Sequence, residues 1–143
     1  MKIKLFMKLN SIFVDTSFFK AFLDPEDDFN RDALMILKRL AVDNPLFVTT
    51  NFILDESYTL LRVRKNLDFA IKLREFIYKD LKGSKVVIVS PEDEAEAWKW
   101  FLNPWKGLSF TDCTSFAVMK RLELSEVATF DNHFSKAGFK VLS

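Results

Sequence analysis

Residues 12–15 read Ile-Phe-Val-Asp, a short run of large apolar side chains closed by an acid. An uninterrupted apolar run of this kind predicts a strand that is buried on both faces, as the central strands of parallel sheets are. The acid that follows, Asp15, then lies at the carboxyl end of the strand. In proteins with parallel sheets, ligands bind beyond this end of the strands.

Further short apolar runs predict more strands, at residues 46–48, 85–89, 127–130 and 140–142. Segments with helical periodicity lie between them, at residues 17–23, 29–42, 51–65, 67–82, 91–102 and 110–122. This alternation predicts an α/β fold with a central, mainly parallel sheet that is flanked by helices and joined by right-handed crossovers. We expect one domain over residues 1–143, with residues 1–11 as an N-terminal extension.

Composition narrows the class of protein. The chain has 143 residues, one cysteine and a formal net charge of +1, and this length is typical of one domain. The lone Cys113 cannot form an internal disulfide, which favours a cytoplasmic location. No apolar segment approaches the ~18 residues of a membrane-spanning helix, so no membrane contact is expected. Because the net charge is small, any contact with nucleic acid must be local.

Four acidic residues lie at strand ends or on inward helix faces, where a charged side chain needs a functional or structural explanation. Asp15 and Asp131 each follow a predicted strand. At 100° per residue, Glu56 falls within the apolar arc of its predicted helix, whereas its neighbour Asp55 falls on the polar side. Asp112 shares a helix face with large apolar side chains. Two acids therefore end strands, and two lie on inward helix faces.

Each of these acids also has a structural explanation. Aspartate is common in turns and at helix N-caps, which would account for Asp15 or Asp131 alone. Asp112 fits a capping box that begins at Ser109. An arginine from elsewhere in the fold would neutralise Glu56. A cap and a ligand role are compatible, because a helix N-terminus stabilises negative charge.

Taken together, converging carboxylates require a cation, since their mutual repulsion would otherwise raise their pKa values. Ligands that are all oxygens favour Mg²⁺ or Mn²⁺. Zinc is poorly supported, because the chain has one cysteine and one histidine. Hard cations held by carboxylates usually act on phosphates, so the expected chemistry is phosphodiester hydrolysis.

Four motifs carry a family resemblance: IFVDTSFF at 12–19, LDESYTLL at 54–61, SFTDCTSFAVMK at 109–120 and ATFDNHF at 128–134. In this order they resemble the PIN-domain ribonucleases, and among them the VapC-type toxins of prokaryotic toxin–antitoxin pairs. The resemblance runs from Ile12 to the C-terminus. It departs from the family before the first strand, where this chain is longer.

The resemblance implies a metal-binding quartet formed by Asp15, Glu56, Asp112 and Asp131. It implies supporting hydroxyls at Thr16, Ser109 and Thr111. It further implies a Mg²⁺- or Mn²⁺-dependent endoribonuclease that leaves 5′-phosphate and 3′-hydroxyl ends. The relatives are often homodimers and are silenced by a protein antitoxin, so we expect both kinds of partner beside the RNA substrate.

Other residues invite a functional interpretation with a plainer alternative. Arg62, Arg64 and Lys65 would hold an RNA backbone or form an ordinary solvated helix face. His133 follows Asp131 and is expected either to order its loop by hydrogen bonds or to be merely exposed. A mechanism with Cys113 as nucleophile and His133 as base is the competing one, but a metal mechanism needs no thiolate.

Other function classes remain open at this point. Two alternatives to a toxin remain: a PIN-domain nuclease that acts in RNA processing, and a catalytically silent PIN-like binding module. An aspartyl phosphatase is disfavoured because Asp15-Thr16-Ser17 lacks a second Asp two positions after the first. Metal-dependent cleavage of RNA by the purified protein separates these classes.

Overall fold

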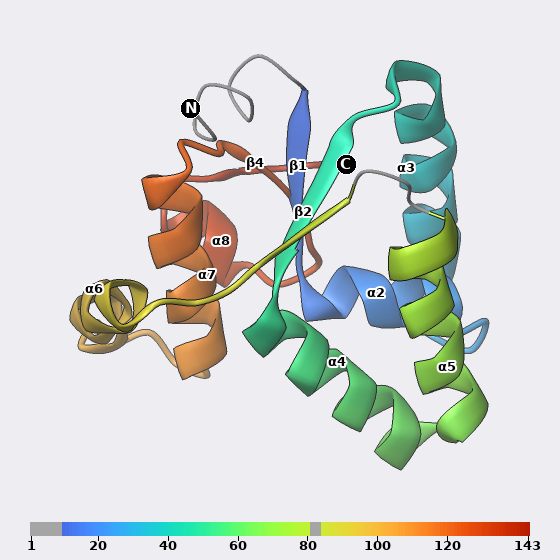
Figure 1. Cartoon of the computed structure of the whole chain (residues 1–143), viewed down its shortest axis with the longest axis horizontal. Coiled ribbons are helices and arrows are strands. Elements are labelled where there is room, and N and C mark those ends of the chain that lie inside the picture. Colours follow the sequence, from blue (N-terminus) through green and yellow to red (C-terminus); the bar gives the residue numbers. More distant parts are fainter. Residues whose placement is uncertain (1–9, 81–83) are drawn as a thin grey trace.

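A computed structural model describes residues 10–80 and 84–143, and at its centre lies a five-stranded sheet (Figure 1). The strands are β1 (Ser11–Val14), β2 (Leu46–Thr50), β3 (Lys85–Val87), β4 (Glu126–Ala128) and β5 (Lys140–Val141). They lie in the order β3-β2-β1-β4-β5, and every neighbouring pair is parallel. The predicted α/β class is therefore confirmed, with a sheet that is parallel throughout.

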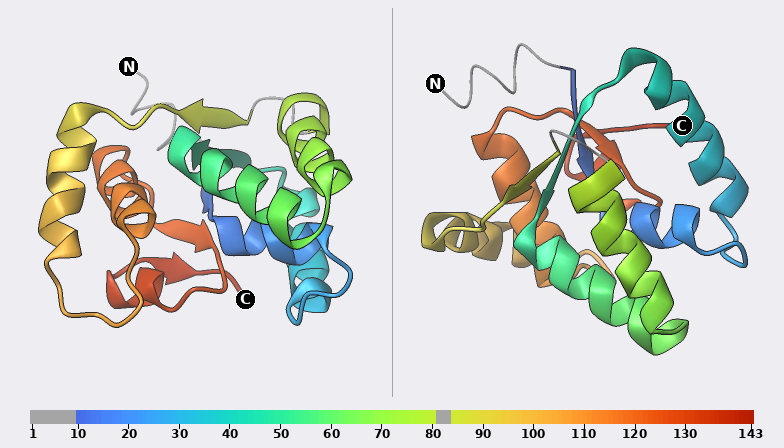
Figure 2. Two further views of the ribbon diagram at one scale, coloured as in Figure 1. Left: turned by 90° about the horizontal axis from the view of Figure 1, so that it is seen from below. Right: turned by 45° about the vertical axis from the view of Figure 1, so that its right-hand side comes forward.

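Seven α-helices cover this sheet within the described ranges. They are α2 (Thr16–Leu23), α3 (Asn30–Asp43), α4 (Asn51–Arg64), α5 (Leu67–Glu75), α6 (Pro91–Phe101), α7 (Phe110–Arg121) and α8 (His133–Lys136). Helices α2 to α5 lie on one side of the sheet and α6 to α8 on the other, as Figures 1 and 2 show. None of these helices is long and apolar enough to cross a membrane.

Strand β1 occupies the middle of the sheet, between β2 and β4. Ile12, Phe13 and Val14 are at most 3% exposed, as expected for a strand covered on both faces. The register pairs Val14 with Ala128 of β4. The two strands therefore end side by side, and the residues that follow them start at the same edge of the sheet.

Two strands end two residues earlier than predicted, for the same physical reason, and β5 ends one residue earlier, at Val141. The strand predicted over residues 127–130 stops at Ala128, and the N–H of Phe130 donates to the Ser17 hydroxyl at 2.9 Å instead of extending the sheet. The strand predicted over residues 85–89 stops at Val87. The N–H of Val89 donates at 2.9 Å to a side chain, that of Asn51. In both places a polar side chain replaces the next strand as acceptor.

Other element boundaries also differ from the prediction. The helix predicted over residues 67–82 is α-helical to Glu75 and continues as a π-helix, Phe76–Asp80, while residues 81–83 lie outside the described ranges. Helix α8 was not predicted, because a single turn of four residues carries little periodicity. Strand β1 begins at Ser11, one residue early, and the predicted extension otherwise lies almost entirely outside the described residues.

Candidate metal centre

Asp15 is buried at the edge of the sheet where β1 ends, and it is the N-cap residue of α2. Two hydroxyls donate to the same carboxylate oxygen, Oδ2: that of Thr129 at 2.8 Å and that of Ser17 at 2.9 Å. These contacts leave the other oxygen, Oδ1, for a different partner. Burial raises the pKa of Asp15 to about 6, opposed by the two hydroxyls and reinforced by the charges of Asp131 and Glu56.

Thr129 joins the loop after β4 to the loop after β1. Its hydroxyl oxygen accepts the N–H of Asp131 at 3.0 Å while it donates to Asp15. The hydroxyls of Thr129 and Ser17 also lie 3.0 Å apart. Sequence reasoning missed both hydroxyl residues as parts of the site. Their positions in the motifs could have indicated this role, because Ser17 follows Asp15 by two residues and Thr129 precedes Asp131 by two.

Asp112 sits in the first turn of α7 and is buried. The capping box is present: the Asp112 N–H donates to the Ser109 hydroxyl at 3.0 Å, and the Ser109 N–H donates to Asp112 Oδ2 at 3.3 Å. Burial, followed by repulsion from Asp15 and Asp131, raises the pKa of Asp112 to about 8. The capping-box interpretation of Asp112 is therefore confirmed, whereas its role as a metal ligand stays a prediction.

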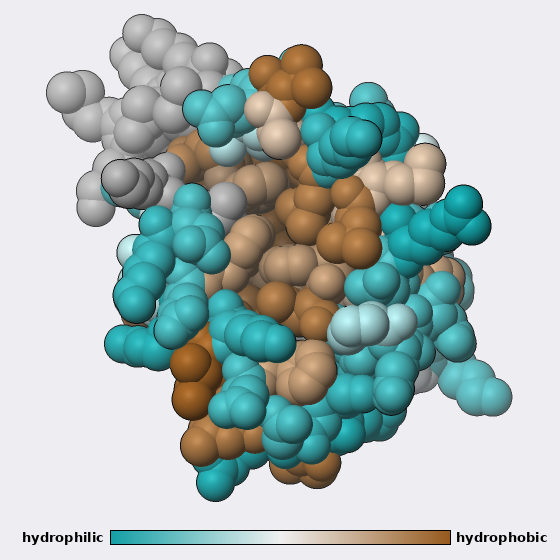
Figure 3. All heavy atoms as spheres, turned by 90° about the vertical axis from the view of Figure 1, so that its right-hand side faces the viewer, coloured by the Kyte–Doolittle hydropathy of each residue, from teal (hydrophilic) through white to brown (hydrophobic). Residues whose placement is uncertain are grey.

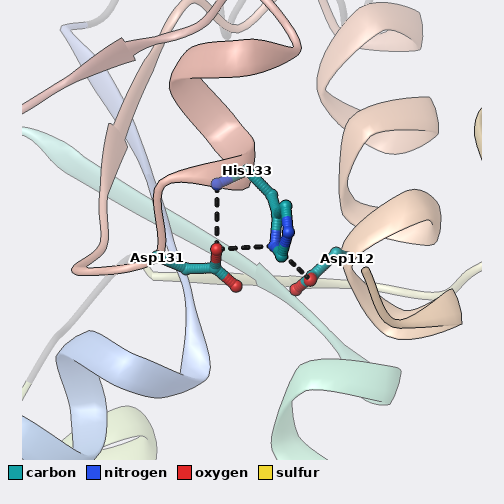
Figure 4. A group of neighbouring side chains, drawn as sticks. All are labelled: Asp112, Asp131 and His133. Atoms are coloured by element: carbon teal, nitrogen blue, oxygen red, sulfur yellow. Dashed lines mark hydrogen bonds and ion pairs between the residues drawn. The ribbon is translucent and has the colours of Figure 1, made fainter. Parts of the chain in front are cut away.

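Asp131, in the loop after β4, and His133, the first residue of α8, face Asp112 (Figure 4). Asp131 Oδ1 accepts the backbone N–H of His133 at 2.9 Å. The imidazole Nδ1 lies 2.8 Å from Asp131 Oδ1 and 3.6 Å from Asp112 Oδ2. One donor atom from each of the three residues lies within 4.8 Å of the others. As predicted, His133 takes part in ordering this loop, and it is buried.

Glu56 lies on α4 at the side of this cluster. It is half-buried and Asp55 is exposed, so the helix phase predicted for the two acids is confirmed. The charge of Glu56 acts on Asp15 and helps to raise its pKa. Glu56 also lines an open cavity of about 480 Å³ together with Arg64 and Thr111. Among the described residues, no arginine or lysine forms an ion pair with Glu56, so the neutralising arginine considered above is absent there.

The three predicted supporting hydroxyls have different positions. Ser109 caps α7 and thereby holds Asp112. Thr111 lines the cavity beside Glu56. Thr16 points elsewhere: its hydroxyl accepts from Ser57 of α4 at 3.0 Å, so it joins α2 to α4. The hydroxyl that holds Asp15 on this helix belongs to the next residue, Ser17, because its position follows the N-cap by two residues.

The three residues of the predicted basic segment, Arg62, Arg64 and Lys65, have different surroundings in the structure. Lys65 is engaged in the fold, since its ammonium lies 3.1 Å from Asp24 and 2.8 Å from Glu26. Arg62 and Arg64 are exposed. Only Arg64 of the two lines the cavity that contains Glu56. The interpretation as an RNA contact is therefore left with Arg62 and Arg64, with Arg64 nearer the carboxylates.

A second cavity, of about 520 Å³, adjoins the other side of the cluster. It is lined by Thr129 and Asp131, by residues of α3 that include Arg39, and by the C-terminal residues 141–143. The exposed Arg39 was not among the predicted RNA contacts, since nothing local marks one arginine of a solvated helix face. Asp131 thus lines one cavity and Glu56 another, and each cavity has an arginine in its lining.

Cys113 does not have the surroundings of a nucleophile. The side chain is buried, and burial together with the charge of Asp112 raises the thiol pKa to about 11. The thiol therefore stays protonated at neutral pH, and only a thiolate is an efficient nucleophile. The ring nitrogens of His133 contact the carbonyl of Lys106 and Asp131 instead. The cysteine mechanism is thus disfavoured.

The electrostatics of the cluster fit a divalent cation. The pKa values of Asp15 and Asp112 are both raised, by burial first and by neighbouring carboxylates second. Such groups either keep a proton or bind a cation that offsets their repulsion. One carboxylate oxygen each of Asp112 and Asp131 lies within 4.8 Å of the other and of a His133 ring nitrogen, and carboxylate oxygens are ligands that suit Mg²⁺ or Mn²⁺. Whether each of the four predicted acids is a ligand stays a prediction.

The fold and the cluster define a class of protein. The sequence model of the PIN domain matches residues 12–140, and the chain belongs to this family. It is 35% identical over 130 residues to the 23S rRNA-specific endonuclease VapC20 of Mycobacterium tuberculosis, in two strains, with 90% of this chain and 95% of the relative covered. The predicted resemblance to PIN-domain proteins of the VapC type is therefore confirmed.

Two solved structures share the fold. The crystal structure of M. tuberculosis VapC20, described as a sarcin–ricin loop cleaving toxin, matches with a TM-score of 0.77 and 34% identity, over 90% of this chain and 95% of that one. The crystal structure of FitAcB from Neisseria gonorrhoeae matches with a TM-score of 0.65 and 18% identity, over 92% of this chain and 96% of that one. The second likeness concerns the fold alone.

Proposed function

We propose that this protein is an endoribonuclease that hydrolyses RNA phosphodiester bonds at a carboxylate-held Mg²⁺ or Mn²⁺ centre, and that it is the toxin of a toxin–antitoxin pair. One observation carries the proposal. Buried carboxylates with raised pKa values, Asp15 and Asp112, face Asp131 in a chain that is 35% identical to an rRNA endonuclease. A structural role alone does not require three aspartates to share one desolvated site.

In this proposal Asp15, Glu56, Asp112 and Asp131 hold the cation. When bound, the cation polarises the phosphate, acidifies the attacking water and stabilises the leaving oxygen. The chain supplies the preorganisation. Hydroxyls from Ser17 and Thr129 keep Asp15 in one orientation, and the capping box keeps Asp112 in another. Groups fixed before substrate arrives need no reorganisation during the reaction.

The substrate is RNA, and ribosomal RNA is the first class to test, because the relative VapC20 is named for cleaving 23S rRNA. Arg64 would bind a backbone phosphate on the Glu56 side, with Arg62 two residues before it on the same helix. Arg39 would do so on the Asp131 side. A phosphate contact at each end would draw the strand across the carboxylates.

Protein partners are part of the proposal. On the side where α3 and α5 lie, apolar side chains gather in a hollow with a polar rim (Figure 3). Helices α3 and α5 also expose large apolar side chains, among them Leu34, Met35 and Ile71. Exposed apolar surface of this kind supports contact with another protein. An antitoxin and a second copy of the chain are the partners we propose.

The test is cleavage of intact 23S rRNA by purified protein, with and without Mg²⁺ or Mn²⁺, followed by sequencing of the RNA ends. We expect discrete cuts that leave 5′-phosphates, that EDTA prevents, and that Asp15→Asn and Asp131→Asn abolish. Asp55→Asn, which removes the same charge from an exposed neighbour of Glu56 that lines the same cavity, is the matched control. Cleavage at the wild-type rate by folded Asp15→Asn protein, or in EDTA, would contradict the proposed centre. Binding of RNA without any cleavage would favour a silent binding module.

A further inference from the structure

The His133 imidazole is fixed in one orientation. The residue is 7% exposed. Its ring lies parallel to Trp105, with an interplanar angle of 3°. Its Nε2 lies 2.8 Å from the backbone carbonyl oxygen of Lys106. Because a carbonyl oxygen only accepts hydrogen bonds, Nε2 is the donor in this contact, and Nδ1 is the ring nitrogen left for another partner.

The Nδ1 atom faces the carboxylates. It is buried and makes no aligned hydrogen bond, although it lies 2.8 Å from Asp131 Oδ1 and 3.6 Å from Asp112 Oδ2 (Figure 4). The short distance to Asp131 is thus a close approach without hydrogen-bond alignment. A buried ring nitrogen beside two carboxylates, with no aligned hydrogen-bond partner, is an incomplete contact that a metal ion bound among the three atoms would complete.

We propose that His133, through Nδ1, is a ligand of the cation centre, which is then a mixed nitrogen and oxygen site rather than one of oxygens alone. This inference rests on the proposed function. The spacing suits it: ligand atoms at about 2.1 Å from a metal ion and at right angles lie about 3 Å apart. The distances of 2.8 Å and 3.6 Å bracket this value.

The outer contact of the ring supports the same role. Histidines that ligate metals donate their other ring N–H to a carbonyl or carboxylate, which fixes the tautomer and the ring orientation. The Lys106 carbonyl does this for His133. The consequence is selectivity. Mg²⁺ prefers oxygen ligands, whereas imidazole suits transition metals, so His133 shifts the preference of the site from Mg²⁺ towards Mn²⁺.

The experiment uses the fact that His133 is the only histidine in the chain. Protein without a histidine tag is prepared with ¹⁴N-histidine and with ¹⁵N-histidine, loaded with Mn²⁺, and measured by electron spin echo envelope modulation. We expect modulation from a directly bound nitrogen that changes with the isotope. His133→Gln keeps an N–H donor near the Nε2 position but has no Nδ1. It should lose the signal and bind Mn²⁺ at least about tenfold more weakly, with Mg²⁺ affinity changed less than about threefold.

The controls separate this inference from the proposed function. Melting of the metal-free His133→Gln protein checks that it folds, and Asp112→Asn checks that Mn²⁺ occupies the carboxylate site. Mn²⁺ binding that Asp112→Asn abolishes, without any isotope-sensitive nitrogen in the wild type, would overturn the ligand role of His133 and leave the carboxylate centre in place. Equal Mn²⁺ affinity of wild type and His133→Gln would overturn it as well. No Mn²⁺ binding at all would overturn the proposed centre and this inference together.

Discussion

The hydroxyl of Thr129 donates to Asp15 Oδ2 at 2.8 Å, across 114 positions of sequence. The same oxygen of Thr129 accepts the N–H of Asp131 at 3.0 Å, so one hydroxyl sets the positions of two acids of the cluster. This contact exists because β1 and β4 are adjacent and parallel and end at the same edge. The geometry of the candidate centre therefore depends on a residue that is not itself acidic.

Thr129→Val removes this hydroxyl with little change in shape. We expect the pKa of Asp15 to rise further, because a hydrogen bond to its charged form is lost, and Mn²⁺ affinity to fall about tenfold. Isothermal titration with Mn²⁺ measures the affinity. Thr16→Val is the matched control, since that hydroxyl contacts Ser57 and not the carboxylates. Equal losses of affinity in the two variants would show that the Thr129 contact is not specific.

Divalent metal should stabilise the folded protein. Free Mn²⁺ at about 100 times its Kd should add roughly 2.7 kcal/mol to the free energy of unfolding, which is about 5–15 °C in Tm for a domain of this size. Asp15→Asn should leave the metal-free Tm unchanged or raise it, because it removes a buried charge from a repulsive cluster. It should also blunt the metal response. Thermal melts of the wild type and of Asp15→Asn, with and without Mn²⁺, test this. An equal Tm shift in the two proteins would contradict a shared acidic site.

Glu56 and Asp55 are neighbours on α4 that line the same cavity, but Glu56 is half-buried and Asp55 is exposed. We expect Glu56→Gln to slow RNA cleavage at least about tenfold, because the charge of Glu56 acts on Asp15, and Asp55→Asn, at an exposed position, to have little effect. Initial rates of cleavage of the same RNA, measured side by side for the two variants and the wild type, test this prediction. If both variants lose the same activity, the side of α4 that faces the substrate has been assigned wrongly.

Arg64 lines the cavity beside Glu56, whereas Arg62 does not. Arg64→Ala should raise KM more than Arg62→Ala and lower the slope of log affinity against log salt by about 1, as the loss of one phosphate contact does. Binding of an uncleavable RNA at several salt concentrations measures the slope. Identical slopes in the two variants would mean that neither arginine, or both, contacts the backbone.

The raised pKa values make the stability of the metal-free protein depend on pH. The pKa values of Asp15, about 6, and Asp112, about 8, lie above those of an unfolded aspartate. Between the unfolded and folded pKa values, the folded state therefore binds more protons, and the free energy of unfolding falls as pH rises. Melts in EDTA should show a lower Tm at pH 8.5 than at pH 5.5. Asp112→Asn should flatten this dependence, and an unchanged slope would exclude Asp112 as its source.

Competition between the proton and the cation also determines how metal affinity depends on pH. A cation must displace the proton that Asp112 holds at neutral pH, so Mn²⁺ affinity should rise from pH 6 to pH 8.

At low pH the stability of the fold depends on a different carboxylate, Asp24. The pKa of Asp24 is lowered to about 2 through its contacts with Lys20 and Lys65, although it is also partly desolvated. Its contribution to stability is lost only as pH falls below about 4.

The sequence alone determined the features that depend on short-range geometry. Periodicity distinguishes Glu56 from Asp55, because one residue is 100° of helix rotation. The capping box of Ser109 and Asp112 follows from a spacing of three residues. The acids after β1 and β4 follow from apolar runs that end at a polar residue. These features are local, so the chain encodes them wherever the rest of the fold lies.

Only the tertiary structure decided which side chains meet. Ser17 and Thr129 share Asp15 because two strands far apart in sequence are adjacent in the sheet. Lys65 is held by Asp24 because α2 and α4 pack together, although its neighbours in sequence suggest an RNA contact. His133 faces the carboxylates through Nδ1 because the Lys106 carbonyl holds Nε2. Such contacts are set by loop closure and packing over long separations, and these leave no local signature in the sequence.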